Sequence, residues 1–407
     1  MFNLAERLPA CIHSITIEDV GDLDVHCLLA GQSSDPLLLL LHGFPELSFS
    51  WRKIMPALAQ LGYFVVAPDQ RGYGRTRAAS LRGRDTGWTV SFDTDFSSSS
   101  LCRMAGDARN LVAALGYSEV HAVIGHDFGS PVAGVCALLR PDIFKSVVLM
   151  SSPFAGAPDI QVGQRIPKLP LTANNDTVVS QHSDNSPDEG KLAAASLNIP
   201  EALSELSRPR VHYQWYYSDE EANNNMWKSA GSLKSFFRNY YHHKSADWPG
   251  NTIYPLDGLN ATQLAKLPTY YVMDAGMGMV ETVAEHAPSV SEVDSCQWLS
   301  DSELEVYVAE FQRTGFQGGL QSYRCNTSGL NTAELQIYRG KSIDVPSMFV
   351  AGCHDWGVYQ FPGDIETLQT SFTTEFRGTH LVEGAGHWVQ QEQPDAVLGI
   401  LQAFLGN

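Results

Sequence analysis

Hydrophobic residues along the chain form short unbroken runs that alternate with segments of helical periodicity. Unbroken runs predict strands buried on both faces of a parallel sheet. They occupy residues 36–42, 63–69, 120–126 and 146–152, and residues 344–352 and 378–386 look like two further strands. Helical patterns follow at 50–61, 101–115 and 129–139. At the start of the chain, residues 12–20 and 23–30 flank a Gly-Asp turn, which predicts an antiparallel hairpin. The alternation predicts the α/β fold class, with helices on both faces of the sheet.

The middle of the chain breaks this alternation. Residues 158–195 are polar and interrupted by Pro, Asn, Asp and Ser, which predicts loop structure in part. Residues 196–330 carry helical patterns rich in aromatic side chains, with no strand expected among them. We therefore expect a first part of an α/β core at 1–155, an inserted all-helical cap at 156–334, and a second part of the core at 335–407.

Composition narrows the class of protein. The chain has 407 residues and a net charge of −18, which argues against a nucleic-acid partner and against an anionic membrane surface. No apolar run is long enough to span a bilayer, and the N-terminal sequence lacks the pattern of a secretory leader. The seven cysteines are scattered without a CxxC pair, which favours reduced thiols and a cytoplasmic location.

The first candidate for chemistry lies at the end of the strand 120–126, where the sequence reads Gly-His-Asp-Phe-Gly. A nucleophile flanked by Gly125 and Gly129 predicts a nucleophile elbow, a tight turn between strand and helix that exposes Asp127. Backbone amides at the start of the next helix would favour the ionised carboxylate. An aspartate that only caps this helix is the structural alternative.

An oxyanion hole is expected beside this elbow. The sequence LHGFPE follows the strand at 36–42. In this arrangement one backbone N–H comes from that loop and one from the residue after the nucleophile. The two donors here are the backbone amides of Phe44 and Phe128.

The remaining candidates follow two later strands in the order nucleophile, acid, histidine. The sequence AGCHDWG places Asp355 after the strand at 344–352, and EGAGHWVQQEQP places His387 after the strand at 378–386. Asp364 and Glu383 are alternative acids, but their positions fit the loop less well. A carboxylate nucleophile suits attack on a saturated carbon, which gives an alkyl ester that water can cleave.

Five motifs occur in the order typical of the soluble epoxide hydrolase family: HGFPELSFSWR, APDQRGYG, GHDFGS, GLQSYR and GAGHWVQQEQP. The chain resembles that family over nearly its whole length. The resemblance implies an α/β-hydrolase fold with a mostly parallel eight-stranded sheet, flanking helices and a helical cap over the catalytic face. It also implies an epoxide hydrolase that needs no metal and no organic cofactor.

The resemblance further implies a division of roles. Asp127 forms a covalent alkyl ester with the epoxide, and His387, supported by Asp355, activates the water that hydrolyses the ester. Two cap tyrosines protonate the epoxide oxygen, and alignment places them at Tyr213 and Tyr323. Tyr216 and Tyr217 stay open as alternatives for the first of these tyrosines.

Other functions remain open. A hydrolytic dehalogenase would use the same triad, but halide-binding relatives tend to carry Trp and Asn at the positions of Phe128 and Phe44. A non-hydrolytic epoxide-opening enzyme and a ligand-binding protein on a hydrolase fold are further alternatives. Many relatives carry an aromatic residue at the position of Ser322, so pocket shape and substrate are left open. The expected partners are a small-molecule epoxide and water, and formation of a homodimer is left open.

Overall fold

The structure is a computed structural model that describes residues 3–82, 89–157, 198–228 and 232–406. Its main sheet runs through eight strands in the order β1, β2, β4, β3, β6, β7, β10, β11, with the short β5 (Arg77–Ala78) paired to β2. The strands are β1 (His13–Val20), β2 (Leu23–Ala30), β3 (Leu37–Leu41), β4 (Phe64–Pro68), β6 (Ala122–His126), β7 (Val147–Met150), β10 (Ser347–Gly352) and β11 (Phe376–Val382). From β4 to β11 every pairing is parallel, so the predicted mostly parallel sheet is confirmed.

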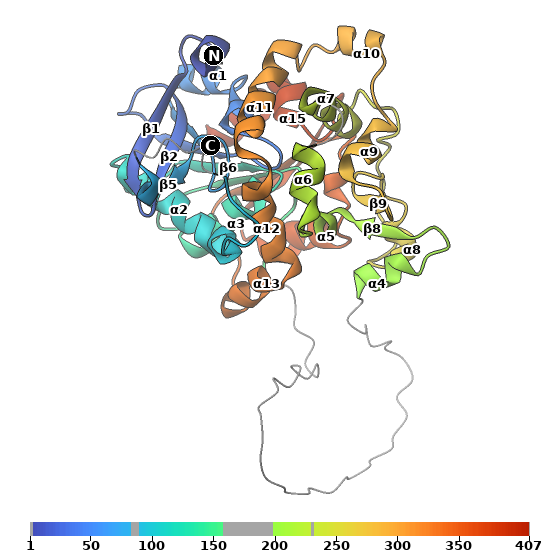
Figure 1. Ribbon diagram of the computed structural model, residues 1–407. Helices are drawn as coiled ribbons and strands as arrows, with labels where there is room; N and C mark the ends of the chain where they lie inside the picture. The colour runs from blue at the N-terminus through green and yellow to red at the C-terminus, as the bar shows by residue number, and fades with distance from the viewer. Residues whose placement is uncertain (1–2, 83–88, 158–197, 229–231, 407) are drawn as a thin grey trace, which may run out of the picture.

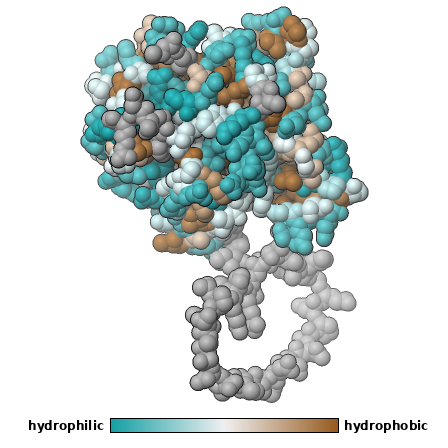
Figure 2. Space-filling view, in the orientation of Figure 1, coloured by the Kyte–Doolittle hydropathy of each residue, from teal (hydrophilic) through white to brown (hydrophobic). Residues whose placement is uncertain are grey.

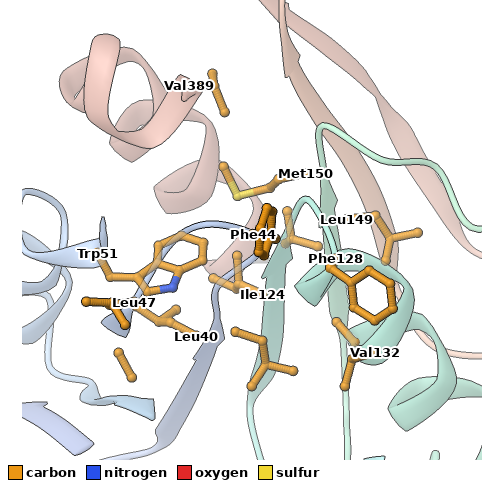
Figure 3. Packing of buried hydrophobic residues seen from close by; sticks show 14 of the residues in the cluster. Leu40, Phe44, Leu47, Trp51, Ile124, Phe128, Val132, Leu149, Met150 and Val389 are labelled. Atoms are coloured by element: carbon orange, nitrogen blue, oxygen red, sulfur yellow. The ribbon is translucent and has the colours of Figure 1, made fainter. Parts of the chain in front are cut away.

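The centre of the sheet is built from strands that are buried on both faces and almost wholly apolar, with His126 at the end of β6 as the exception. All five leucines of β3 are buried, as are β6 and β7 beside it. Figure 3 shows Leu40, Ile124 and Leu149, from three adjacent strands, in one packed cluster with Phe44 and Phe128. Burial of such strands on both faces is what an unbroken hydrophobic run predicts.

Helices pack on this sheet close to where the sequence places them. The helices of the core are α1 (Met55–Gln60), α2 (Leu101–Ala114), α3 (Gly129–Leu139), α14 (Asp364–Thr367), α15 (Val389–Glu392) and α16 (Pro394–Leu405). The helix expected at 50–61 is divided into a 3₁₀ turn at Ser48–Trp51 and α1. The division falls where Pro56 opens α1, because proline has no N–H to continue the preceding turn.

Between β7 and β10, the described part of the chain contains a series of helices that lies beside the sheet, in green to orange in Figure 1. We call residues 198–228 and 232–335 the cap segment. Its helices are α4 (Ile199–Ser204), α5 (Tyr213–Tyr217), α6 (Glu221–Trp227), α7 (Leu233–Lys244), α8 (Ala261–Leu264), α9 (Met279–Ala284), α10 (Val290–Ser295), α11 (Asp301–Thr314), α12 (Gln317–Thr327) and α13 (Leu330–Leu335). The predicted loop at 158–195 lies outside the described residues, and the domain boundaries remain a prediction.

The prediction of an all-helical cap is wrong in one respect. The strands β8 (Arg210–His212) and β9 (Val272–Asp274) form a two-stranded antiparallel sheet in the cap segment. Each strand is only three residues long, and the two lie far apart in sequence. Neither therefore shows a strand pattern alone, and their pairing depends on how the cap helices pack. The pairing fixes the point where α5 begins, at Tyr213.

The cap segment is tied to the core by polar contacts from α11. The guanidinium of Arg52 donates to Glu303 at 2.7 and 2.9 Å, and Arg75 donates to Glu310 at 2.7 Å. The hydroxyls of Ser50 and Tyr307 lie 2.8 Å apart in the same interface. The visible face of the molecule is mostly hydrophilic with scattered hydrophobic groups (Figure 2). Among the described residues, no helix has the length and apolar character needed to cross a membrane.

A buried carboxylate, Asp69, organises the loop after β4. It accepts hydrogen bonds from the backbone N–H and hydroxyl of Ser48 at 3.0 and 2.7 Å and from the N–H of Arg75 at 3.0 Å. Its other neighbour is Nδ1 of His26, at 2.8 Å. Burial alone would raise the pKa of Asp69, but His26 and the hydrogen-bond donors lower it well below its usual range.

Replacing Asp69 with asparagine is expected to destabilise the fold by about 3 kcal/mol at neutral pH, because three hydrogen-bond donors and an imidazole lose a buried carboxylate. A carboxyl with a lowered folded pKa stabilises the protein above its unfolded pKa of about 4. This contribution is lost as pH falls toward the folded value. The difference between wild type and Asp69→Asn in urea unfolding should therefore shrink below about pH 4. The exposed Asp257→Asn variant is the control, and an equal loss of stability there would contradict the assignment.

Candidate active site

Asp127 occupies the strained turn that the sequence predicts. Its φ is +50°, in the left-handed region, and its backbone N–H donates to the Met150 carbonyl at 3.1 Å. A Cβ on Gly125 would lie 2.0 Å from the carbonyl oxygen of Gly129, and one on Gly129 would lie 2.3 Å from that of Leu41. Both positions must therefore be glycine, as expected for a nucleophile elbow.

His387 lies between the two predicted aspartates. Its Nε2 is 3.1 Å from Oδ2 of Asp127, and its Nδ1 is 3.1 Å from Oδ1 of Asp355. Oδ1 of Asp355 also accepts the backbone N–H of Gly357 at 2.8 Å, which fixes the carboxylate. His387 and Asp355 are each 1% exposed. Since both ring nitrogens face carboxylate oxygens, only the imidazolium can donate to both at once.

The charges of Asp127, His387 and Asp355 stabilise one another. Burial alone would raise the pKa of Asp127, but its hydrogen bond and charge interaction with His387 lower it well below its usual range, with smaller contributions from Lys244 and His126. Burial likewise opposes ionisation of Asp355, and His387 again lowers its pKa. Both carboxyls are therefore ionised at neutral pH, as a nucleophile and its supporting acid require.

The expected oxyanion-hole donors lie at the nucleophile. The backbone N–H of Phe44 donates to Oδ1 of Asp127 at 2.8 Å. The N–H of Phe128 belongs to the first turn of α3 and donates to no other group among the described residues. Figure 3 shows the two phenylalanines at the ends of adjacent strands.

The two alternative acids lie elsewhere. Glu383 contacts Sγ of Cys353 at 3.4 Å, near the surface. Asp364 begins α14 and lines the outer part of a cavity, where burial raises its pKa to about 7. Of these three acids, the structure brings only Asp355 into hydrogen-bonding distance of His387.

A cavity of about 270 Å³ opens onto Asp127 between the core and the cap segment. Its wall combines Asp127 and Phe128 from the core with Tyr213 of α5 and Tyr323 of α12. The ring centroids of the two tyrosines are 5.8 Å apart. Burial is the main cause that raises the pKa of both phenols, so both remain protonated and can donate.

The alternatives for the first tyrosine do not share this wall. Tyr216 and Tyr217 are absent from the described lining of the cavity. Tyr217 is fully buried, and its hydroxyl donates to that of Tyr240 at 3.2 Å. Of these four tyrosines, only Tyr213 and Tyr323 line the cavity beside Asp127, while the ring of Tyr217 packs behind them against Tyr323 and Phe44.

Sequence reasoning missed Glu46, Gln360 and Glu392, three residues that organise the site. Oε2 of Glu46 accepts the N–H of Gly43 at 3.1 Å and lies 2.5 Å from Nδ1 of His126, whose Nε2 donates to the His387 carbonyl at 2.7 Å. Burial alone would lower the pKa of His126, but Glu46 raises it. Gln360 accepts the hydroxyl of Tyr213 at 3.2 Å. Of these residues, only Glu46 could have been singled out from the sequence, because it is the acid that ends the motif LHGFPE.

A buried carboxyl group at the end of α15 holds the His387 loop in place. Glu392 accepts the backbone N–H groups of Gly386 and Trp388, each at 2.9 Å, and that of Ala246 at 2.8 Å. The first two donors flank His387 directly. The position of the imidazole is therefore set by backbone contacts on both of its sides.

Comparison with known proteins agrees with this geometry. Residues 36–394 match the family model for the alpha/beta hydrolase fold. Epoxide hydrolase B of Mycobacterium tuberculosis is 30% identical over 375 residues, which cover 91% of this chain and 92% of that protein. Epoxide hydrolase A of the same organism is 29% identical, covering 95% of each chain. The crystal structure of epoxide hydrolase A from Mycobacterium thermoresistibile is 27% identical, with a TM-score of 0.67, covering 97% of this chain and 98% of that one.

The fold, the elbow and the matching model define an enzyme of the α/β-hydrolase fold family. Within that class, the chain belongs to the epoxide hydrolase family.

Proposed function

We propose that this enzyme converts an epoxide and water to a vicinal diol through a covalent ester on Asp127. The observation that carries the proposal is the position of the Asp127 carboxylate. It lies between the Phe44 N–H and His387, in a cavity whose wall also carries two tyrosine side chains. Such tyrosines suit an oxygen leaving group, which needs a proton, better than a halide, which needs none.

In the first step, a carboxylate oxygen of Asp127 forms a bond to one epoxide carbon while that carbon's bond to the ring oxygen breaks. The ring oxygen takes a proton from Tyr213 or Tyr323. Both phenols border the same cavity as the nucleophile, so they can polarise the ring oxygen before attack. The product of this step is a hydroxyalkyl ester and a phenolate.

In the second step, His387 takes a proton from water, and the resulting hydroxide attacks the ester carbonyl carbon. The N–H groups of Phe44 and Phe128 stabilise the oxyanion that forms on the carbonyl oxygen. When the tetrahedral group collapses, the ester oxygen leaves as the second hydroxyl and takes the proton from His387. The regenerated Asp127 carboxyl still carries a proton and gives it to the tyrosine phenolate. This transfer restores both the carboxylate and the phenol.

Oxygen labelling tests this route. With enzyme in excess over a styrene oxide probe in H₂¹⁸O, a single turnover should place the label in the Asp127 carboxyl and leave the diol unlabelled. Direct attack of water on the epoxide would place the label in the diol. The second outcome would overturn the covalent route while keeping the epoxide as substrate.

Replacing either cavity tyrosine with phenylalanine should slow consumption of the epoxide. We expect about a 10- to 100-fold loss for Tyr213→Phe or Tyr323→Phe, and about a 10³-fold loss for the double variant, because the ring oxygen then leaves without a proton. Single-turnover consumption of epoxide measures this step. Tyr217→Phe is the matched control, since its hydroxyl contacts Tyr240 instead of the cavity. An equal loss in that control would contradict the assignment.

A further inference from the structure

Lys244, the last residue of α7, is a buried cation without a carboxylate partner. The residue is 3% exposed, and it forms no salt bridge among the described residues. Removing an ammonium group from water without pairing it to an anion is strongly unfavourable. Most other lysines in the described part of the chain avoid this situation. Lys234, for example, pairs with Asp301 at the surface.

Aromatic rings hold the ammonium in one place. Nζ of Lys244 lies 5.0 Å from the ring centre of Tyr271, 5.5 Å from those of Tyr240 and Trp388, and 5.7 Å from that of Tyr270. Rings at these distances attract a cation through their electron-rich faces. These rings surround the ammonium group but carry no negative charge. The electric field of the ammonium group therefore extends beyond them.

The backbone of the same residue supports the catalytic histidine loop. The N–H of His387 donates to the Lys244 carbonyl at 2.9 Å. A Cβ on Gly386 would lie 2.7 Å from that carbonyl oxygen, which shows how closely the end of α7 packs on the loop. Lys244 therefore lies beside the loop that carries His387.

The charge of Lys244 acts on the acids of the site. Burial lowers the pKa of Lys244, and the carboxylates of Asp127, Asp355 and Glu46 oppose that change. In return, Lys244 is one of the cations that lower the pKa of Asp127. The other two are the imidazoles of His387 and His126, which carry a positive charge only when protonated.

We infer that Lys244 is a positioning residue whose fixed charge keeps His387 in the neutral form that deprotonates water during ester hydrolysis. The inference rests on the proposed covalent route. Before the ester forms, Asp127 and Asp355 both favour the imidazolium. Once Asp127 is esterified, only Asp355 still favours the imidazolium form of His387, and the positive charge of Lys244 disfavours that form.

Titratable groups of several neighbouring elements lie around His387. Among them, Glu392 of α15 lies against the His387 loop, and burial raises its pKa to about 8. Asp127 follows β6, Asp355 follows β10, and His126 at the end of β6 lies with its ring centre 5.1 Å from that of His387. Glu46 balances the charge of His126 at 2.5 Å. Removing the charge of Lys244 should therefore leave Asp355 dominant, so that the histidine stays protonated to higher pH.

The test is the pH dependence of ester hydrolysis, followed by single-turnover diol release after the ester has formed from styrene oxide. In Lys244→Met and Lys244→Gln, the acid limb should move up by about one pH unit. Within that limb the rate should be about tenfold lower than in wild type. Lys244→Arg, which keeps the charge, and the exposed control Lys266→Met should both retain the wild-type position of the limb.

Two results would overturn the inference. An equal loss of rate at every pH, with the acid limb unmoved, would make Lys244 a packing residue only. Failure of both neutral variants to fold, judged by circular dichroism and thermal unfolding, would likewise assign it to structure. If wild type itself forms no ester with the epoxide, the proposed function has failed instead, and the two failures are thereby distinguished.

Discussion

Replacing Asp127 with alanine is expected to lower epoxide turnover by roughly 10⁴-fold or more, because the variant lacks the atom that attacks the ring carbon. His387 cannot substitute for it, since the route from substrate to diol passes through the Asp127 ester. The cavity and its tyrosines stay in place, so the variant should still bind epoxide. Steady-state diol formation measures the loss, and a competition assay with a slowly reacting epoxide measures binding.

Asp257→Ala is the control for this variant, because it removes an exposed aspartate of the cap segment. It should retain wild-type turnover. Thermal unfolding should give a folded Asp127→Ala protein of equal or somewhat lower stability, because alanine tolerates the φ of +50° less well than aspartate and the contact with His387 is lost. A folded Asp127→Ala enzyme that turns over epoxide within tenfold of wild type would contradict a nucleophilic role.

The second large effect is expected from His387→Gln. Glutamine can keep a hydrogen bond toward Asp355, but it cannot take a proton from water, so ester hydrolysis should slow by about 10³-fold. Attack by Asp127 does not need the base. The variant should therefore consume about one equivalent of epoxide rapidly and then stall, and rapid-quench measurement of epoxide and diol separates the two phases.

His13→Gln, which changes an exposed histidine on β1, should behave as wild type in the same assay. If His387→Gln consumed no epoxide while remaining folded, the histidine would be needed for the first step, and the order of events proposed here would be wrong. If it released diol at the wild-type rate, another group would be the base.

The sequence predicts the core well because each central strand shows its burial in its own residues. An unbroken run such as 37–41 needs no knowledge of its neighbours to be read as a strand buried on both faces. The elbow is equally local, since a Cβ on Gly125 would meet the backbone four residues further on. The chain order of Asp355 and His387 then follows from the topology of the fold.

Other features depend on contacts between distant segments, and the sequence could not supply them. Tyr213, Tyr216 and Tyr217 share one short helix, and only the packing of α5 against α12 decides which of them faces the cavity. The pairing of β8 with β9 has the same origin. In the sequence, Lys244 is an ordinary lysine at the end of a helix. Only the fold brings four aromatic rings around its ammonium group, those of Tyr240, Tyr270, Tyr271 and Trp388.

The covalent ester on Asp127 is the central claim, and intact mass spectrometry of His387→Gln tests it most directly. After mixing with styrene oxide, the variant should gain the mass of one whole epoxide, and the gain should map to the peptide that contains residues 123–134. A haloalkane panel run in parallel should leave no adduct. A folded variant that gains no mass from the epoxide, or that gains only an alkyl group from a haloalkane, would contradict the account.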